Sequence, residues 1–389
     1  GVANPFYEGE VLLNKFNKTQ KISFFGLGSN TPLSTFGYRD RNRFGLDNES
    51  GGGFKYSDMG GDQNNVSGIP KKAKVGFNYS YYNTELDATS SSLSQYFLSD
   101  SSYFTDNYAN NVNKDESHRI NLKLISDIDS LTYFELRPGI TIDAASQNDS
   151  SNSTFLTDNA KETLNTTIKN LNNSEGYSIN SRAKLRRRFK KDKRELMLKY
   201  NFQMNDNKTN GSLLSATTYY GIIDYVDVVD QQKENVNSSQ KHTGILTFTE
   251  PLSKKIKLEM EYEYRYELSD LSITSFNNVN GEYTELVSDN SNIFKNIRQE
   301  NKAGAKFIYE TKKHVFNVGS RLRNVAISNE NLISDTLILQ NINNLLPNFR
   351  YKYKPSRSKS LSFAYNTASS QPSISALQPI QDNANPNRI

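Results

Sequence analysis

The sequence has no cysteine, no tryptophan and no long hydrophobic run, and these absences exclude several classes of protein. Without cysteine there is no disulfide framework and no thiolate metal site, which fits a compartment where free thiols would be oxidised. No apolar stretch approaches the roughly 18 residues that a membrane-crossing helix requires, so a helical membrane protein is excluded. A net charge of +5 over 389 residues is too small and too scattered to indicate nucleic acid as a partner.

The start of the chain lacks a recognisable leader. Gly1 opens directly into a strand-like segment, without the basic and apolar stretches of a secretory signal. We therefore expect that a signal has been removed or that the sequence is an excerpt of a longer protein.

The segment 256–266 shows a strictly alternating pattern. Its apolar positions are Ile256, Leu258, Met260, Tyr262, Tyr264 and Tyr266, and the positions between them are Lys257, Glu259, Glu261, Glu263 and Arg265. Successive side chains of a strand point to opposite faces, so this strand separates an apolar from an aqueous environment. Its length of about ten residues matches a tilted membrane-crossing strand.

The composition agrees with a β-barrel in a membrane. The mean hydropathy of −0.72 is low because only alternate strand positions of a barrel meet lipid, and polar loops lower the average further. The 23 tyrosines and 21 phenylalanines can form the aromatic girdles for which tryptophan is absent. The sequence thus predicts an all-β fold, an antiparallel transmembrane β-barrel.

The same alternation predicts about fourteen strands along the chain. They are expected at 7–16, 20–29, 72–82, 86–98, 117–127, 131–143, 176–189, 194–204, 240–250, 256–268, 299–310, 313–325, 347–354 and 359–366.

The predicted connections alternate between short and long. The short ones are 17–20, a turn near Asn83, 127–130, 190–193, 251–255, 311–312 and 355–358. The long ones are 30–71, 99–117, 144–175, 205–239, 269–298 and 326–346, and they are rich in Asn, Ser, Asp and Gly. Short periplasmic turns and long extracellular loops are typical of outer-membrane barrels, and we expect the long segments to be solvated loops.

This arrangement predicts a single barrel domain over 1–389 that is truncated at both ends. With short turns in the periplasm, the strand 7–16 runs toward the periplasm, whereas a complete barrel begins with a strand in the opposite direction. We expect at least one further strand before Gly1 and one after Ile389.

Several segments resemble the barrel region of TonB-dependent-receptor-like outer-membrane proteins of the Bacteroidota type. They are YEGE at 7–10, NKFN at 14–17, QYFLSDS at 95–101, HRINL at 118–122, QPSISALQP at 371–379 and NANP at 383–386. The resemblance implies a larger barrel of about 22 strands with an upstream plug domain. It also implies an inner-membrane energy-coupling protein and an imported ligand as partners, and a surface lipoprotein is a further possible partner.

The charged positions of the alternating strands predict a water-filled lumen. We expect its wall to include Arg182, Lys184, Arg186, Arg188, Lys199, Lys257, Glu259, Glu261, Glu263, Arg265, Arg321 and Arg323. The basic run 184–194 could also suggest nucleic-acid binding, but alternation divides it between one strand face and a short turn.

Enzymatic chemistry has no signature in this chain. His118, His242 and His314 lie in different predicted strands without the spacing of metal ligands. Asp224, Asp227 and Asp230 lack the glycine and glutamate of a calcium loop. No nucleophile motif or phosphate loop is present, so we expect no enzyme, no metal and no cofactor.

Three functions remain open from the sequence. The first is the barrel of a TonB-dependent-receptor-like transporter that takes up a ligand across the outer membrane. The second is an outer-membrane barrel with a structural or adhesive role. The third is a soluble or fibrous all-β surface protein. In the first two, outer-membrane lipid is a partner.

Overall fold

The computed structural model describes residues 7–17, 20–30, 46–58, 73–97, 102–356 and 358–370, and they form one antiparallel sheet of fifteen strands. The strands are β1 (Glu8–Phe16), β2 (Gln20–Ser29), β3 (Leu46–Asp58), β4 (Lys74–Phe97), β5 (Ser102–Asp127), β6 (Thr132–Thr157), β7 (Glu162–Arg188), β8 (Glu195–Tyr219), β9 (Tyr225–Pro251), β10 (Ile256–Val279), β11 (Glu282–Leu286), β12 (Asn292–Glu310), β13 (His314–Asn331), β14 (Thr336–Tyr353) and β15 (Leu361–Asn366). A single 3-10 turn, η1 (Ser288–Asn290), interrupts them within the described residues. No helix of this part of the chain is long and apolar enough to cross a membrane.

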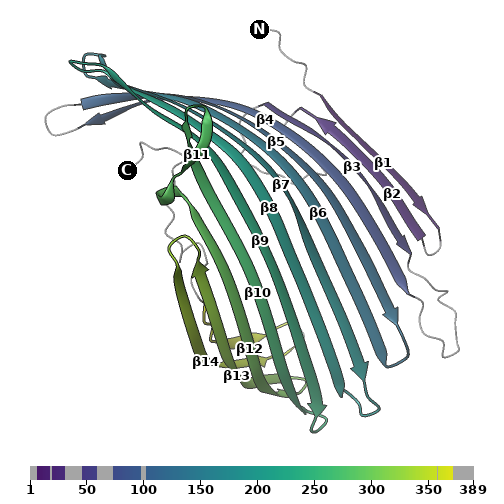
Figure 1. The fold of residues 1–389 in the computed structure, drawn as a ribbon. Helices are drawn as coiled ribbons and strands as arrows, with labels where there is room; N and C mark the ends of the chain where they lie inside the picture. Colours follow the sequence, from purple (N-terminus) through teal and green to yellow (C-terminus); the bar gives the residue numbers. More distant parts are fainter. Residues whose placement is uncertain are drawn as a thin grey trace.

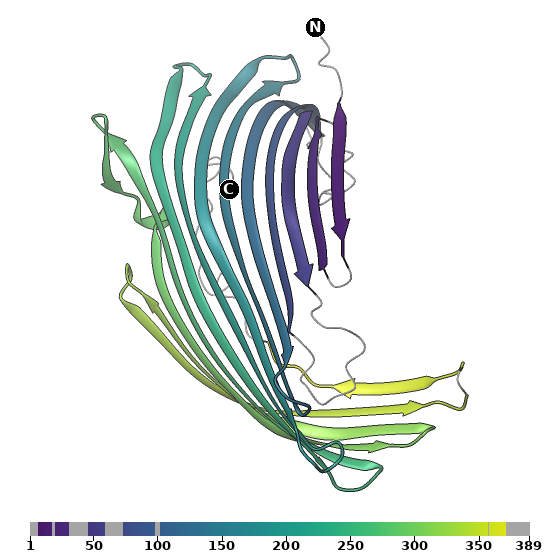
Figure 2. The same ribbon diagram turned by 90° about the vertical axis from the view of Figure 1, so that its right-hand side faces the viewer.

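The strands follow chain order across the sheet, as in an up-and-down barrel wall. Each strand of the path pairs with the next one along the chain, and β11 folds back onto β10 beside this path. Figures 1 and 2 show one strongly curved layer, in which β12 to β15 turn away from the direction of the earlier strands. Within the described residues β1 and β15 are the two edges, and the sheet is open between them.

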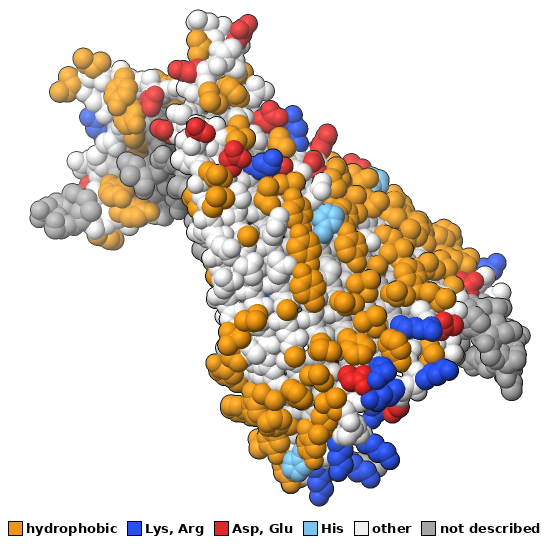
Figure 3. Space-filling model, turned by 60° about the horizontal axis from the view of Figure 1, so that its bottom comes forward, with side chains coloured by type: hydrophobic (Ala, Val, Ile, Leu, Met, Phe, Trp, Pro, Cys, Tyr) orange, Lys and Arg blue, Asp and Glu red, His pale blue; other side chains and the backbone are white. Residues whose placement is uncertain are grey.

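The register divides the side chains of the sheet into two faces of opposite character. Tyr262 lies opposite Leu246 of β9 and Ala303 of β12, and these rows of apolar partners continue through the sheet. The resulting apolar belt includes Val11, Leu13, Phe24, Leu122, Ile140, Leu185, Leu198, Leu246, Met260, Tyr262, Phe307, Phe316, Val318, Leu345 and Phe363, all exposed. In Figure 3 it forms a broad hydrophobic area on the outer side of the curved sheet.

The opposite surface, here called the polar face, lies on the inner side of the curve. Neighbouring residues of β13 show the inversion: Leu322 is 65% exposed, whereas Arg323 is only 5% exposed. In a soluble protein the leucine would be buried and the arginine exposed. The exposed leucine is favourable only if hydrocarbon surrounds the belt.

Two predicted features near the start of the chain are wrong. β4 runs without interruption through Asn83, so the segments 72–82 and 86–98 are one strand rather than a hairpin. β3 lies inside the predicted loop 30–71. The alternation did not reveal β3 because the strand contains three consecutive glycines. The middle of the strand requires glycine, because a Cβ atom on Gly53 would clash with the carbonyl oxygen of Tyr79. The two errors cancel, so the predicted directions of the strands from β5 onward are unchanged.

Most of the predicted long loops are also strands. β4 to β10 have 24 to 27 residues each, more than twice the roughly 9–11 that a tilted strand needs to cross the membrane. Beyond the belt the strands are joined by short polar side chains. Asn152 Nδ2 donates to Thr167 Oγ1 at 3.0 Å, and the hydroxyls of Ser174 and Thr209 are 2.7 Å apart. Hydrophobic alternation ends at the belt, whereas backbone pairing continues, so the pattern alone could not detect these extensions.

The short turns lie at the end of the sheet next to the belt. Asp129 closes the turn between β5 and β6, where its carboxylate accepts hydrogen bonds from the backbone N–H groups of Leu131 (2.7 Å) and Thr132 (2.8 Å). The hydrogen bond from Leu131 is the main cause that lowers the pKa of Asp129 to about 2. Other turns are basic: Lys254, Lys255, Lys312 and Lys313 are exposed, and Lys and Arg gather at this end in Figure 3.

The two faces predict opposite labelling of neighbouring positions. Cysteine at Leu258, Leu198 or Phe316 in the full-length protein should react with a lipid-restricted reagent, and cysteine at Glu259, Lys199 or Arg321 with a water-soluble one. Leu258→Arg should cost about 2–4 kcal/mol of folding free energy if the position is near the bilayer midplane. Reaction of the Glu259 position with the lipid-restricted reagent, with the Leu258 position silent, would reverse the faces.

The paired extensions predict where a protease can cut. Protease added to intact cells should cleave at the hairpin tip 220–224, which lies outside the strands and contains the fully exposed Ile222, and should spare the flanking strands β8 and β9. A strand whose backbone is already hydrogen-bonded within a sheet cannot enter the active site of a protease, whereas an exposed loop tip can. Cleavage sites spread through 205–239 would show that this segment is a loop in the cell. Cleavage confined to 251–255 and 311–313 would show that the short turns, and not the long hairpins, face the outside of the cell.

Candidate functional site

All twelve residues predicted to line a lumen lie on the polar face. Lys184 and Lys199 are directly opposite each other on β7 and β8, and Lys302 of β12 lies between Glu263 and Arg323. The same register places Arg182, Arg186, Arg188, Lys257, Glu259, Glu261, Arg265 and Arg321 on this face. The charged face crosses β7 to β13 and opposes the belt everywhere.

A buried ionic network lies at the centre of this face. Glu300 of β12 is fully buried, and its carboxylate contacts Lys302 Nζ at 2.7 Å, Arg298 Nη2 at 2.8 Å and Arg323 Nε at 2.9 Å. Arg265 Nη1 lies 3.5 Å from the same carboxylate. We call these residues, together with Glu263, the Glu300 cluster.

Glu263 connects the cluster to β10. Its carboxylate contacts Lys302 Nζ at 3.1 Å and Arg265 Nη2 at 3.2 Å. Four cations therefore share two carboxylates. Buried charges are stable only when paired and hydrogen-bonded, and this network binds three adjacent strands at one level.

The residues predicted to line a lumen did not include Glu300, Lys302 and Arg298. All three follow the same alternation in 299–310 and just before it, so the signal was present in the pattern. Only the register of β12 against β10 and β13 shows that these side chains meet residues that were predicted.

Glycines make room for long charged side chains on the polar face. Arg321 lies opposite Gly304, where an added Cβ would clash with Arg321 Cγ and lie 2.6 Å from the carbonyl oxygen of Ser320. Arg321 can thus lie across β12 and reach Glu261 at 3.4 Å. Lys306 lies opposite Gly319 and pairs with Glu259 at 2.6 Å.

The β7–β8 part of the polar face has a different charge balance. Arg182, Lys184, Arg186 and Lys199, here called the cationic ladder, have no ion pair within 4.0 Å in the part of the chain that the structure describes. The nearby Glu135 of β6 is already engaged, because it accepts a hydrogen bond from Tyr133 Oη (2.5 Å) and pairs with Arg137. Lys184 Nζ and the Arg186 guanidinium lie over the Tyr133 ring, 5.7 and 5.0 Å from its centre.

The three histidines lie on the belt side instead. The Nδ1 atom of each histidine shares a hydrogen bond with a tyrosine hydroxyl of the neighbouring strand. The pairs are His118 with Tyr79 (2.9 Å), His242 with Tyr200 (2.7 Å) and His314 with Tyr351 (3.0 Å). Amphipathic aromatic groups favour the boundary between hydrocarbon and water. No cluster of three or more His, Asp or Glu side chains suited to a metal occurs among the described residues.

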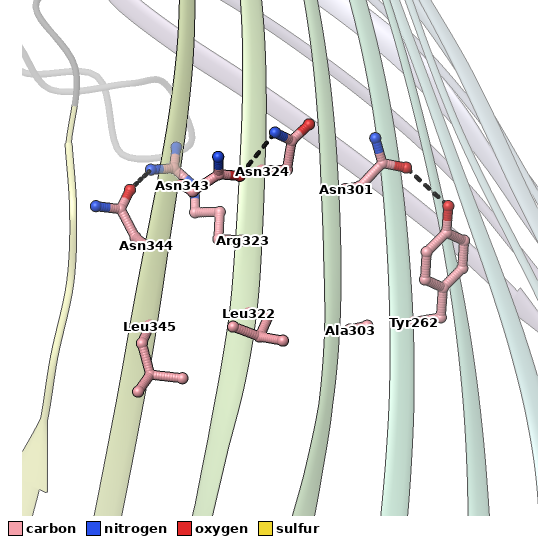
Figure 4. Close-up of a pocket in the computed structure, with 9 residues that line it drawn as sticks. All are labelled: Tyr262, Asn301, Ala303, Leu322, Arg323, Asn324, Asn343, Asn344 and Leu345. Atoms are coloured by element: carbon pink, nitrogen blue, oxygen red, sulfur yellow. Dashed lines mark hydrogen bonds between the residues drawn. The ribbon is translucent and has the colours of Figure 1, made fainter.

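A shallow hollow of about 440 Å³ also opens on the belt side. Figure 4 shows Ala303 between the larger side chains of Tyr262, Leu322 and Leu345, which occupy one row of the register. Asparagines 301, 324 and 343 border it, and Tyr262 Oη donates to Asn301 Oδ1 at 2.7 Å. Arg323 and Asn344, which belong to the other face, also line it.

The Glu300 cluster predicts unequal effects of two similar substitutions. Glu300→Gln should destabilise the full-length protein by about 3–5 kcal/mol, because it leaves the buried Arg323 without its countercharge. Glu261→Gln removes the partner of Arg321 in a pair whose side chains are 30% and 44% exposed, and should cost less than about 1 kcal/mol. Denaturant titrations followed by heat-modifiability on gels would measure both. Equal losses would show that burial of Glu300 does not matter.

Comparison with known proteins gives one match. The model of the outer membrane protein beta-barrel family matches residues 187–389, slightly more than half of the chain. No curated protein and no solved structure matches the sequence.

The family match covers the strands that show the belt and the polar face most clearly. It includes β8 to β15 and thus the whole Glu300 cluster. The match, the antiparallel sheet and the exposed belt agree on one environment, in which lipid covers the outer side of the sheet. The chain belongs to the outer membrane protein beta-barrel family and is a multi-pass β-barrel protein of the bacterial cell outer membrane.

Proposed function

We propose that this chain forms part of the barrel wall of a TonB-dependent-receptor-like transporter, which takes up a ligand across the outer membrane. The observation that carries the proposal is the polar face, where fixed charges from β7 to β13 are held in register on the inner side of the sheet. A passage for polar ligands needs such a wall, because charged groups hydrate it and hold its contents.

The resemblance of the sequence supports the partners in this proposal. A plug domain within the barrel would contact the polar face, and an inner-membrane protein would supply the energy for transport. The imported ligand would reach the passage from the outer end, where the hairpins of β4 to β10 extend the wall beyond the belt. A surface lipoprotein would bind at the same outer end.

A second candidate function is adhesion at the cell surface. The tip between β8 and β9 exposes Ile222 completely and Ile223 to 83%, far from the belt. Exposed apolar side chains on a monomer often mark an interaction surface. An adhesive barrel would use these tips and would not require energy from the inner membrane.

Measuring which solutes remain in the growth medium after culture can distinguish the two functions, and it does not require that the ligand be known. Three strains would be compared: the parent, a strain without this gene and a strain without the inner-membrane energy-coupling protein. If the protein is a transporter, the strain without this gene should leave certain solutes in the medium. The strain without the energy-coupling protein should leave the same solutes and others besides. Re-expression of the gene should restore their consumption.

The opposite pattern would contradict transport. If the strain without this gene consumes every solute as the parent does but loses cell–cell or cell–surface attachment, the adhesive barrel is the correct function. Deleting only the tip 220–224 should then reproduce the attachment defect, while the fold of the barrel remains intact.

A further inference from the structure

Within the described residues, the cationic ladder gathers four cations without ion pairs on two neighbouring strands, whereas carboxylates of β10 to β13 hold cations in ion pairs. On β10 to β13, Glu259, Glu261, Glu263 and Glu300 each contact at least one cation. On β7 and β8, Lys184 and Lys199 are directly opposite each other instead. Like charges at directly opposite positions destabilise a sheet. Such a cost requires a compensating role.

Elementary strand geometry gives the dimensions of the ladder. Arg182, Lys184 and Arg186 follow one another at alternate positions of β7, so their Cα atoms are about 6.7 Å apart. Lys199 lies beside Lys184, with Cβ atoms about 4.5–5.5 Å apart. Four positive groups therefore line a strip about 13 Å long on the polar face. A strip of this length can contact two or three oxyanion groups of one molecule.

The ladder also holds an unused hydrogen-bond donor. Arg186 Nε is buried and has no hydrogen-bond partner. Lys184 and Arg186 lie over the Tyr133 ring, and Glu135, the residue opposite Lys184 on β6, already binds Tyr133 and Arg137. Lys184 and Lys199 are partly exposed and Arg182 is exposed, so an arriving anion can reach them. An oxyanion would supply the missing countercharge.

We propose that the cationic ladder is a binding site for a solute that carries two or more oxyanion groups, phosphate or carboxylate. The inference deepens the proposed function, because it names the chemical class of the ligand, and it rests on that function only for the passage of the solute. Guanidinium groups bind oxyanions through two parallel hydrogen bonds, and lysines add compact charge. An acidic segment of a plug domain is the competing occupant.

Calorimetric titration of the purified full-length protein with inorganic pyrophosphate tests the site. The wild type should bind saturably at low salt, and binding should weaken as salt rises. Lys184→Gln with Lys199→Gln should weaken binding by about tenfold or more, as expected when charge-assisted hydrogen bonds are lost. Lys254→Gln with Lys255→Gln, in a turn outside the polar face, removes the same charge and should leave the affinity unchanged.

Thermal unfolding of the same variants distinguishes binding from a structural role. Removing the opposed lysines should leave the melting temperature equal or higher, because it relieves repulsion. A lower melting temperature together with unchanged affinity would overturn the proposal. So would the absence of saturable binding by the wild type, or binding that appears only after an acidic plug segment has been displaced.

Pyrophosphate binding and solute uptake can fail separately. Binding that depends on Lys184 and Lys199, in a protein whose deletion leaves every solute consumed, would reject the transport function and leave the anion site standing. Solute uptake by the wild type without such binding would reject the site alone.

Discussion

Continuous backbone pairing between neighbouring strands is the constraint on which the rest of this structure depends. Hydrocarbon offers no hydrogen-bond partners, so every N–H and C=O group in the belt must be paired within the sheet. Antiparallel pairing in chain order achieves this and also fixes the register. Once the register is fixed, the alternation of each sequence segment assigns every side chain to lipid or to the inner surface. The belt and the polar face are two results of one pairing scheme.

The polar face is not uniform, and its two parts have different physical characters. In the Glu300 cluster, carboxylates and cations are interleaved across β10, β12 and β13, which makes this part stiff and internally compensated. On β7 and β8 the cations lack such compensation. The glycine opposite Arg321 lets this long side chain lie across β12 toward Glu261.

A structural feature could be predicted only where it leaves a local pattern in the sequence. The alternation around Leu258 and Glu259 identified strand, face and membrane environment together, because lipid and water impose opposite demands on adjacent residues. The outer halves of β6 and β7 lack this signal: water lies on both sides, and Asn, Ser and Thr fit either face. β3 was hidden by glycines that close approach requires. The buried state of Glu300 depends on partners from three strands, and no local pattern contains that information.

The paired polar extensions of β4 to β10 have a consequence for how the protein can change over time. Their strands are joined mainly through the backbone and through short side chains such as Asn152, Ser174 and Thr209. Neither lipid nor a tightly packed core dictates the identity of their outward residues. Substitutions there can alter the surface that the hairpins present beyond the belt, while lipid still constrains the membrane-embedded part of the same strands. One continuous hairpin thus combines an anchor whose residues lipid constrains with an outer half whose outward residues can vary.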